Sequence, residues 1–179
     1  MVEGRDWTST QFDRCPNCGW DPLDVPDGDL ARAVVDACDE WPRLLIGAPD
    51  DRLRRRPEPA VWCALEYACH VRDLTEVFRF RIERMRVESD ADLAWWDHEA
   101  SVLDDNYAGQ DPEAVGRDIV ANGRALAATL DDVRSKEWDR TAERRPGEVF
   151  TIRGAARFVI HEIVHHRGDA DRMIAGAET

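Results

Sequence analysis

Four stretches of this chain place apolar residues at intervals of three and four, which is the spacing of amphipathic α-helices. The stretches cover about residues 29–46, 58–87, 111–133 and 151–174. Pro42 is expected to kink or end the first stretch, and Asp111 can cap the third. No segment shows the alternation of a convincing β-strand. At 179 residues the chain is long enough for one core, and the pattern predicts an all-α fold, a four-helix bundle.

The remaining segments define the domain organisation. We predict a bundle domain over residues 29–179 and an N-terminal extension over residues 1–28, which carries the loop Cys15-Pro-Asn-Cys18-Gly19. A long polar connection, residues 88–110, separates the second and third helical stretches. It is expected to hold a short helical piece near residues 95–107.

The chain is strongly acidic, with a formal net charge of −13 at neutral pH. Because it has no basic stripe to contact phosphates, nucleic acids and anionic membranes are poor partners. No apolar run approaches the roughly 18 residues of a membrane span, and residues 1–10 lack the apolar core of a signal peptide. An odd count of five cysteines argues against a disulfide framework. We therefore expect a cytoplasmic protein with a small-molecule substrate, and its oligomeric state stays open, a homodimer included.

Helical phase indicates which ionisable side chains face the bundle interior. His70 shares an apolar stripe with Leu74. On the fourth stretch, Ile163 marks the middle of the apolar face at about 100° per residue, with His166 about 60° and Glu162 about 100° away on one flank. Histidines and carboxylates on facing helices are a common way to build a metal site in a bundle. His70, Glu162 and His166 are therefore the predicted ligands of a divalent metal ion.

Neighbouring residues on the fourth stretch bear on this site. Asp169 follows His166 on the same flank and is placed to orient a ligand. His161 and His165 fall about 160° from the middle of the apolar face, on the side turned away from the core. A simpler explanation treats a histidine on an apolar face as an ordinary core residue and Glu162 with His166 as a helix-surface pair. Burying all three predicted ligands without a metal would, however, leave polar groups in need of partners.

The N-terminal loop carries the second chemical feature. The C-x-x-C spacing of Cys15 and Cys18 suits a zinc knuckle or a redox pair, but no thioredoxin-like order of strand and helix flanks it. A zinc site needs two further ligands, and the candidates are His98, or His161 and His165 together. The sequence leaves open whether the two cysteines bind a structural zinc ion or are free thiols in a loop.

Two motifs carry a resemblance to a known family. The run Trp62-Cys-Ala-Leu-Glu-Tyr-Ala-Cys-His-Val-Arg-Asp73, followed by Glu162-Ile-Val-His-His-Arg-Gly-Asp169, resembles the DinB-like metalloprotein superfamily over about residues 29–179. Within it, the chain is similar to an actinobacterial branch of mycothiol-dependent maleylpyruvate isomerases and S-transferases. The resemblance implies a four-helix bundle that holds a divalent metal ion, often zinc or nickel, through one residue of the second helix and two of the fourth.

The same resemblance implies which residues hold the metal. Most members of the superfamily have histidine at both fourth-helix positions, whereas the mycothiol-dependent maleylpyruvate isomerases have glutamate at the first, as this chain has. Carried over by position, the ligands are His70, Glu162 and His166. This chain departs from the family by placing His161 and His165 beside them, so a ligand set shifted by one residue is an alternative.

The function implied is that of a metal-dependent enzyme. Three protein ligands leave an open position on the metal, which is a catalytic arrangement. In the branch that the chain resembles, the metal activates mycothiol for S-transfer or isomerisation on a small electrophilic substrate. Arg72, Arg153 and Arg157 are candidate contacts for a substrate carboxylate, although arginines in an acidic chain more often form plain ion pairs.

The alternative is a non-catalytic metal-binding or stress-response protein that keeps the same bundle and site. An open cavity beside His70 would favour the enzyme, and a plugged one would favour the alternative. Trp95 and Trp96 lie in the long connection, where they could cover the mouth of the site, although packing of the connection onto the bundle is the simpler explanation.

Overall fold

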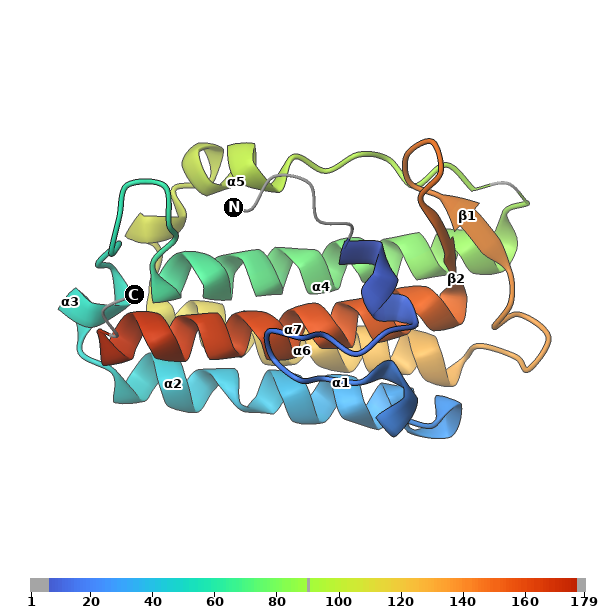
Figure 1. Ribbon diagram of the computed structural model, residues 1–179, viewed down its shortest axis with the longest axis horizontal. Coiled ribbons are helices and arrows are strands. Elements are labelled where there is room, and N and C mark those ends of the chain that lie inside the picture. Colours follow the sequence, from blue (N-terminus) through green and yellow to red (C-terminus); the bar gives the residue numbers. More distant parts are fainter. Residues whose placement is uncertain (1–6, 90, 177–179) are drawn as a thin grey trace.

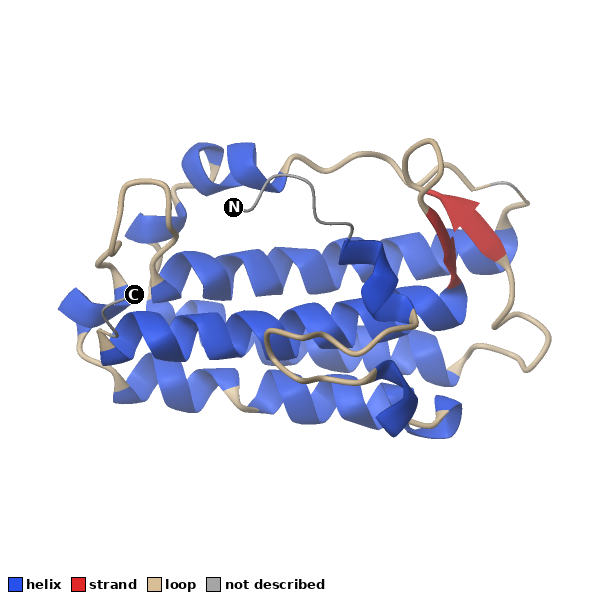
Figure 2. Ribbon diagram, in the orientation of Figure 1, coloured by secondary structure: helices blue, strands red, loops and turns tan. Residues whose placement is uncertain are grey.

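The computed structural model describes residues 7–89 and 91–176 and shows an elongated bundle of helices that run side by side (Figures 1 and 2). Residues 1–6 of the predicted extension and residues 177–179 of the predicted bundle domain lie outside the described residues. The bundle consists of α1 (Leu30–Asp39), α2 (Trp41–Gly47), α4 (Ala64–Val87), α6 (Pro112–Asp131) and α7 (Ile152–Ala175). The shorter helical pieces are η1 (Trp7–Gln11), η2 (Pro22–Asp24), η3 (Asp27–Asp29), α3 (Asp50–Leu53), α5 (His98–Asp104) and η4 (Tyr107–Gly109). The predicted all-α four-helix bundle is confirmed.

The helices are not arranged around the bundle in sequence order. α1 and α2 together form the first column; α1 packs against α6 and α7, and α2 packs against α6. Because α4 packs against α6 and α7 as well, the first column and α4 occupy opposite corners of the bundle (Figure 1). The connection through α3 therefore crosses one end of the bundle. As a result, α4 and α7 are direct neighbours that run in opposite directions.

Local chemistry sets most of the helix ends. Asp111 and Thr151 cap α6 and α7, because their side-chain oxygens accept from the backbone N–H groups of Glu113 (3.2 Å) and Gly154 (2.8 Å). The predicted break at Pro42 is confirmed, since α1 ends before it and Pro42 lies in the first turn of α2.

α4 begins later than predicted, at Ala64 rather than near residue 58. Pro59 disfavours the helical conformation of the residue before it. The carboxylate of Glu66 accepts the backbone N–H of Cys63 at 2.8 Å and is held by the guanidinium of Arg56. This start places His70 in the second turn of α4.

A short hairpin lies between α6 and α7. β1 (Thr141–Glu143) pairs antiparallel with β2 (Val149–Thr151), and Ala142 lies opposite Phe150. The turn between the strands includes Gly147, whose φ of +86° suits glycine. The prediction of no sheet is wrong for these strands. Three residues are too few for an alternating pattern to emerge from the sequence.

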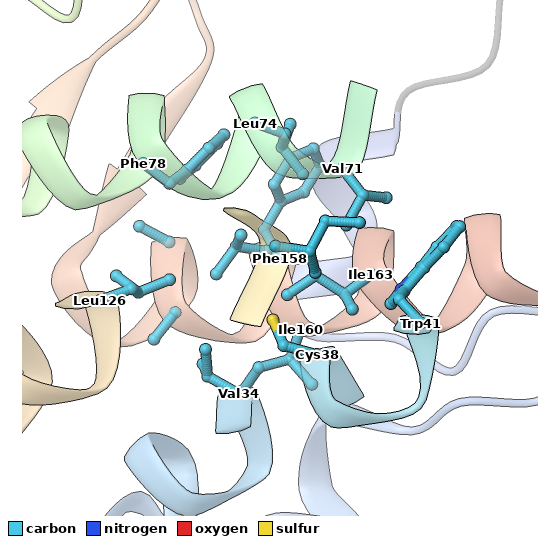
Figure 3. Close-up of a cluster of buried hydrophobic side chains, with 14 of the residues drawn as sticks. Val34, Cys38, Trp41, Val71, Leu74, Phe78, Leu126, Phe158, Ile160 and Ile163 are labelled. Atoms are coloured by element: carbon cyan, nitrogen blue, oxygen red, sulfur yellow. The ribbon is translucent and has the colours of Figure 1, made fainter. Parts of the chain in front are cut away.

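Apolar side chains from all four columns fill the bundle interior (Figure 3). Phe78 of α4 and Phe158 of α7 stack with their ring centroids 5.3 Å apart, and Ile163 is fully buried. In the part of the chain that the structure describes, no helix is long and apolar enough to cross a membrane.

The N-terminal segment, residues 7–28, packs onto the bundle. η1 and η2 contact α7, and Figure 1 shows the segment lying across that helix. Its connecting residues form the loop that carries Cys15, which is fully buried. α7 is therefore covered both by the other helices and by a segment of irregular structure.

Candidate metal centres

One group of potential metal ligands lies between α4 and α7. His70 of α4 and Glu162 and His166 of α7 each offer a ligand atom, and these atoms lie within 4.8 Å of one another. Glu162 and His166 are one helical turn apart, so both side chains leave the same flank of α7. Because α4 and α7 are antiparallel neighbours, this flank faces the second turn of α4. We call these three residues the α4–α7 cluster.

The orientation of His166 is set by two carboxylates. Its Nδ1 donates to Oδ2 of Asp169 at 2.9 Å, and its Nε2 lies 3.5 Å from Oε2 of Glu162. Arg172 pairs with the other oxygen of Asp169. A histidine whose one nitrogen donates to a carboxylate presents the other nitrogen as a ligand, which is the usual arrangement in metal sites. Asp169 thus lies where the sequence places it, against the ring of His166.

His70 is buried, with 4% of its surface exposed, and is enclosed by aromatic rings. Trp96 stacks on its ring at 5.3 Å with an interplanar angle of 6°, and Trp62 lies at 5.1 Å. Among the described residues, Nδ1 of His70 is buried without a hydrogen-bond partner. Burial, reinforced by the nearby His166, holds the pKa of His70 well below its ordinary value. The ring is therefore neutral, which is the form that binds a metal.

The other two members of the α4–α7 cluster are charged. Burial alone would raise the pKa of Glu162, but hydrogen bonds from His161 and His166 outweigh it and hold the pKa below its ordinary value. Burial alone would lower the pKa of His166, but its bonds to Asp169 and Glu162 raise the pKa to about 9. A metal ion bound here must displace the proton of His166. A divalent cation fits this cluster, because two imidazoles and an anionic carboxylate are suitable ligands and the buried Nδ1 of His70 has no hydrogen-bond partner among the described residues.

A second group of potential ligands lies on the adjacent flank of α7, about 100° further around the helix. Cys15, Cys18, His161 and His165 each offer a ligand atom, and these atoms also lie within 4.8 Å of one another. We call these four residues the Cys–His cluster. The predicted alternative in which His161 and His165 complete the site of the two cysteines is the arrangement that the structure brings together.

The cysteine loop is closed by its own backbone. The N–H of Cys15 donates to the carbonyl of Trp20 and the N–H of Gly19 to that of Cys15, both at 2.8 Å, and Gly19 adopts a φ of +77°. Burial would raise the pKa of the Cys15 thiol, but hydrogen bonds from the backbone of Cys18 and Asn17 and from His161 lower it to about 7. The loop therefore favours a thiolate at Cys15.

His161 and His165 are buried although they point away from the bundle core. Both side chains leave the flank of α7 that faces away from the core, as the helical phase indicates, but they are 0% and 8% exposed. The N-terminal segment covers them, and Trp20 lies 5.8 Å from the ring of His161. Helical phase gives the direction of a side chain but not what packs on that side.

His98 lies beside the α4–α7 cluster rather than with the cysteines. Its ring is 5.6 Å from that of His70 and 6.1 Å from that of Trp62. Asp97 caps α5 by accepting from Ala100 at 3.0 Å, which places His98 in the first turn over the α4–α7 cluster. The sequence pattern did not predict His98 at this site. The helical piece expected near residues 95–107 is observed as α5, but the sequence did not indicate where on the bundle this short helix packs.

The three arginines proposed as substrate contacts all carry ion pairs. Arg72 pairs with Asp73 at 2.6 Å, whereas Arg153 and Arg157 both pair with Asp27, at 2.7 and 3.3 Å. None of these partners belongs to either cluster of ligands. Their role toward a substrate stays a prediction.

Comparison with known proteins agrees with this architecture. The sequence profile of the DinB superfamily matches residues 33–170. The chain belongs to the DinB superfamily. Its structure is similar to that of a Bacillus subtilis protein described as "YfiT … a probable metal-dependent hydrolase with an unusual four-helix bundle topology", with a TM-score of 0.67 and 16% sequence identity over 81% of this chain and 87% of that one. No curated protein matches the sequence.

These findings identify the superfamily and the bundle topology. At 16% identity the structural similarity shows the fold alone. The mycothiol-dependent branch, the identity of the metal and the thiol stay predictions.

Proposed function

We propose that this protein is a metal-dependent enzyme that activates a low-molecular-weight thiol, such as mycothiol, for S-transfer or isomerisation on a small electrophilic substrate. The observation that carries the proposal is the α4–α7 cluster, which gathers three ligand-type side chains and no fourth from the described residues. A site with three protein ligands keeps a position for a further molecule. The glutamate in the cluster is the feature that the chain shares with the maleylpyruvate isomerases it resembles.

Each residue of the cluster has a defined part in holding the metal. His70, Glu162 and His166 would bind a zinc or nickel ion, and Asp169 fixes the ring of His166 through the bond at Nδ1. A divalent ion held in this way lowers the pKa of a thiol or water molecule that it contacts. The anionic Glu162 would offset one of the two positive charges of the ion, and the positive charge that remains would still favour an anionic thiolate.

The aromatic residues around the cluster exclude water from the reacting groups. Tyr67 stacks on His166 with ring centroids 5.2 Å apart, and Trp62 and Trp96 enclose His70. A dry environment strengthens the attraction between a thiolate and a cation and prevents hydrolysis of a reactive substrate. His98 is half-buried beside these rings and is the residue we assign to accept the proton of the incoming thiol.

Two observations favour other functions. The Bacillus protein with the same fold is described as a probable metal-dependent hydrolase, and the same cluster would activate water in place of a thiol. The flat stacking of Trp96 on His70 covers one face of that ring, as expected of the non-catalytic metal-binding alternative. All three functions use the same ligands, so the choice between them rests on whether a thiol binds.

The test is thiol binding to the metal-loaded protein. Calorimetry with mycothiol and other common cellular thiols should show binding to the wild-type chain and at least about ten-fold weaker binding to His166→Ala, because a metal ligand is lost. Conjugation or isomerisation of electrophiles, including maleylpyruvate, should then require the same thiol. Equal binding by both proteins, or no thiol binding by either, would reject the proposal. Hydrolysis of esters or amides without added thiol would establish the hydrolase instead.

A further inference from the structure

We infer that the Cys–His cluster is a second metal site, a closed zinc site that fastens the N-terminal segment to α7. Its members are two cysteines three residues apart in a tight loop and two histidines one helical turn apart. Two thiolates and two imidazoles are a donor set that zinc prefers in structural sites. The site is distinct from the α4–α7 cluster, since it lies on the adjacent flank of α7 and shares no ligand with it.

The spacing of the donor atoms suits a tetrahedral ion. With Zn–S near 2.3 Å and Zn–N near 2.0–2.1 Å, the edges of a tetrahedral Cys2His2 site measure about 3.3–3.8 Å. Sγ of Cys15 lies 3.7 Å from Nδ1 of His165, and the whole set of four atoms lies within 4.8 Å. Side-chain rotations that move each donor atom by less than about 1 Å would bring the four atoms to these distances around one ion.

Each histidine of the Cys–His cluster has a carboxylate near the ring nitrogen that faces away from the cysteines. Nδ1 of His161 donates to Oε1 of Glu162 at 2.9 Å, so Nε2 is the nitrogen that would bind the metal. Nε2 of His165 lies 3.6 Å from Oδ2 of Asp169, so Nδ1, the atom near Cys15, would bind. A carboxylate behind each ligating imidazole is the usual support of a metal site.

Burial and ligand number indicate a structural rather than a catalytic site. Cys15 and His161 are 0% exposed and His165 is 8% exposed, and four protein ligands leave no position for a substrate. The segment they fasten has little regular structure, since η1 has five residues and η2 and η3 have three each. A metal ion would supply the cross-link that such a segment cannot obtain from a hydrophobic core of its own.

The two sites meet at Glu162. One of its oxygens lies near His166 within the α4–α7 cluster, and the other accepts from His161 of the Cys–His cluster. A zinc ion on His161 would hold that imidazole in place and, through it, the carboxylate. Loss of the zinc site should therefore weaken metal binding at the α4–α7 cluster by about 10- to 100-fold, the range found when partners of a ligand are removed.

Cobalt titration of the full-length protein tests the inference. Cobalt bound to thiolates absorbs strongly in the near ultraviolet, whereas cobalt on histidine and glutamate alone does not. We expect this band to reach the same final height, that of one cobalt ion on two thiolates per chain, in the wild type and in His70→Ala, which serves as the matched control because it lacks a ligand of the other site. The band should be lost in Cys15→Ser. In Cys18→His it should fall to about half, because one thiolate is replaced by an imidazole.

A second readout separates loss of the ion from loss of the fold. Circular dichroism should show unchanged helix content in Cys15→Ser, while proteolysis within residues 7–28 becomes faster than in the zinc-loaded wild type. Alkylation should spare both cysteines when zinc is bound. The inference is overturned if the folded wild type gives no thiolate band, if the band persists undiminished in Cys15→Ser, or if both thiols of the zinc-loaded protein are alkylated at the rate of an exposed cysteine.

Discussion

The α4–α7 cluster and the Cys–His cluster lie on adjacent flanks of α7 and draw on neighbouring residues of that helix. On one flank, Glu162 and His166 meet a single histidine from another helix. On the other flank, His161 and His165 meet two cysteines from an irregular loop. The first set offers three potential ligands in aromatic surroundings, and the second offers four potential ligands, two of them in a loop that its own backbone closes. The segment that packs against α7, rather than α7 itself, therefore determines whether a cluster suits a substrate-binding metal ion or a structural one.

The largest effect is expected when the ligand contributed by α4 is removed. In a Cys15→Ser/Cys18→Ser background, His70→Ala should weaken metal binding by more than about 100-fold, because two ligands hold a divalent ion far less tightly than three. Elemental analysis after dialysis measures the loss. His98→Ala, which removes a neighbouring imidazole that is no ligand, should keep the metal. Full retention of metal in the His70→Ala variant would disprove the assignment of the α4–α7 cluster.

The second prediction concerns pH. Since the pKa of metal-free His166 is raised to about 9, the ring is protonated at neutral pH and must lose that proton to bind a metal. In the same double-serine background, metal affinity should rise about ten-fold for each pH unit between pH 7 and 9, with about one proton released per ion. Calorimetry in buffers of different ionisation enthalpy counts the protons. An affinity that stays constant over this range would show that His166 is not a ligand.

The first two predictions rest on residues that the sequence already singled out. His70, Glu162 and His166 are brought together by two regular helices, and helical phase predicts which side chains of a regular helix face its neighbour. The order of the columns, with α4 next to α7, could not be obtained in this way. It rests on the superfamily resemblance, which the sequence profile and the fold comparison now support.

What the sequence could not predict lies in irregular segments. The burial of His161 and His165 depends on the path of residues 7–28, and the position of His98 depends on the long connection before α6. Neither segment has a periodicity that reports its neighbours. The β1–β2 hairpin could not be predicted either, because strands of three residues are too short to show an alternating pattern.

The third prediction addresses the residue that touches both sites. Asp169 bonds to Nδ1 of His166 and lies 3.6 Å from Nε2 of His165. Asp169→Asn should lower the thiol-dependent activity by about ten-fold through loss of orientation at His166, with the helix content unchanged. Asp171→Asn is the matched control, since Asp171 is exposed and pairs with Arg167. A fall in activity of the same size in both variants would show that Asp169 has no specific role in orienting His166.

The smallest effect is expected from the arginines. Arg153 and Arg157 both pair with Asp27, outside the two clusters. Replacing either with alanine should change the free energy of unfolding by less than about 1 kcal/mol, as is usual for partly exposed ion pairs, and should leave KM within about two-fold. Steady-state kinetics and urea unfolding check both values. A rise in KM of ten-fold or more would instead assign that arginine to the substrate.

The most direct test of two centres on one helix is X-ray absorption at the zinc edge, combined with elemental analysis of the zinc-loaded protein. We predict two zinc ions per chain and an average of about one sulfur ligand per zinc, because one site supplies two thiolates and the other supplies none. Binding of one ion with no sulfur ligand would leave only the α4–α7 cluster. Binding of one ion with two sulfur ligands would leave only the Cys–His cluster, and either result would contradict the account.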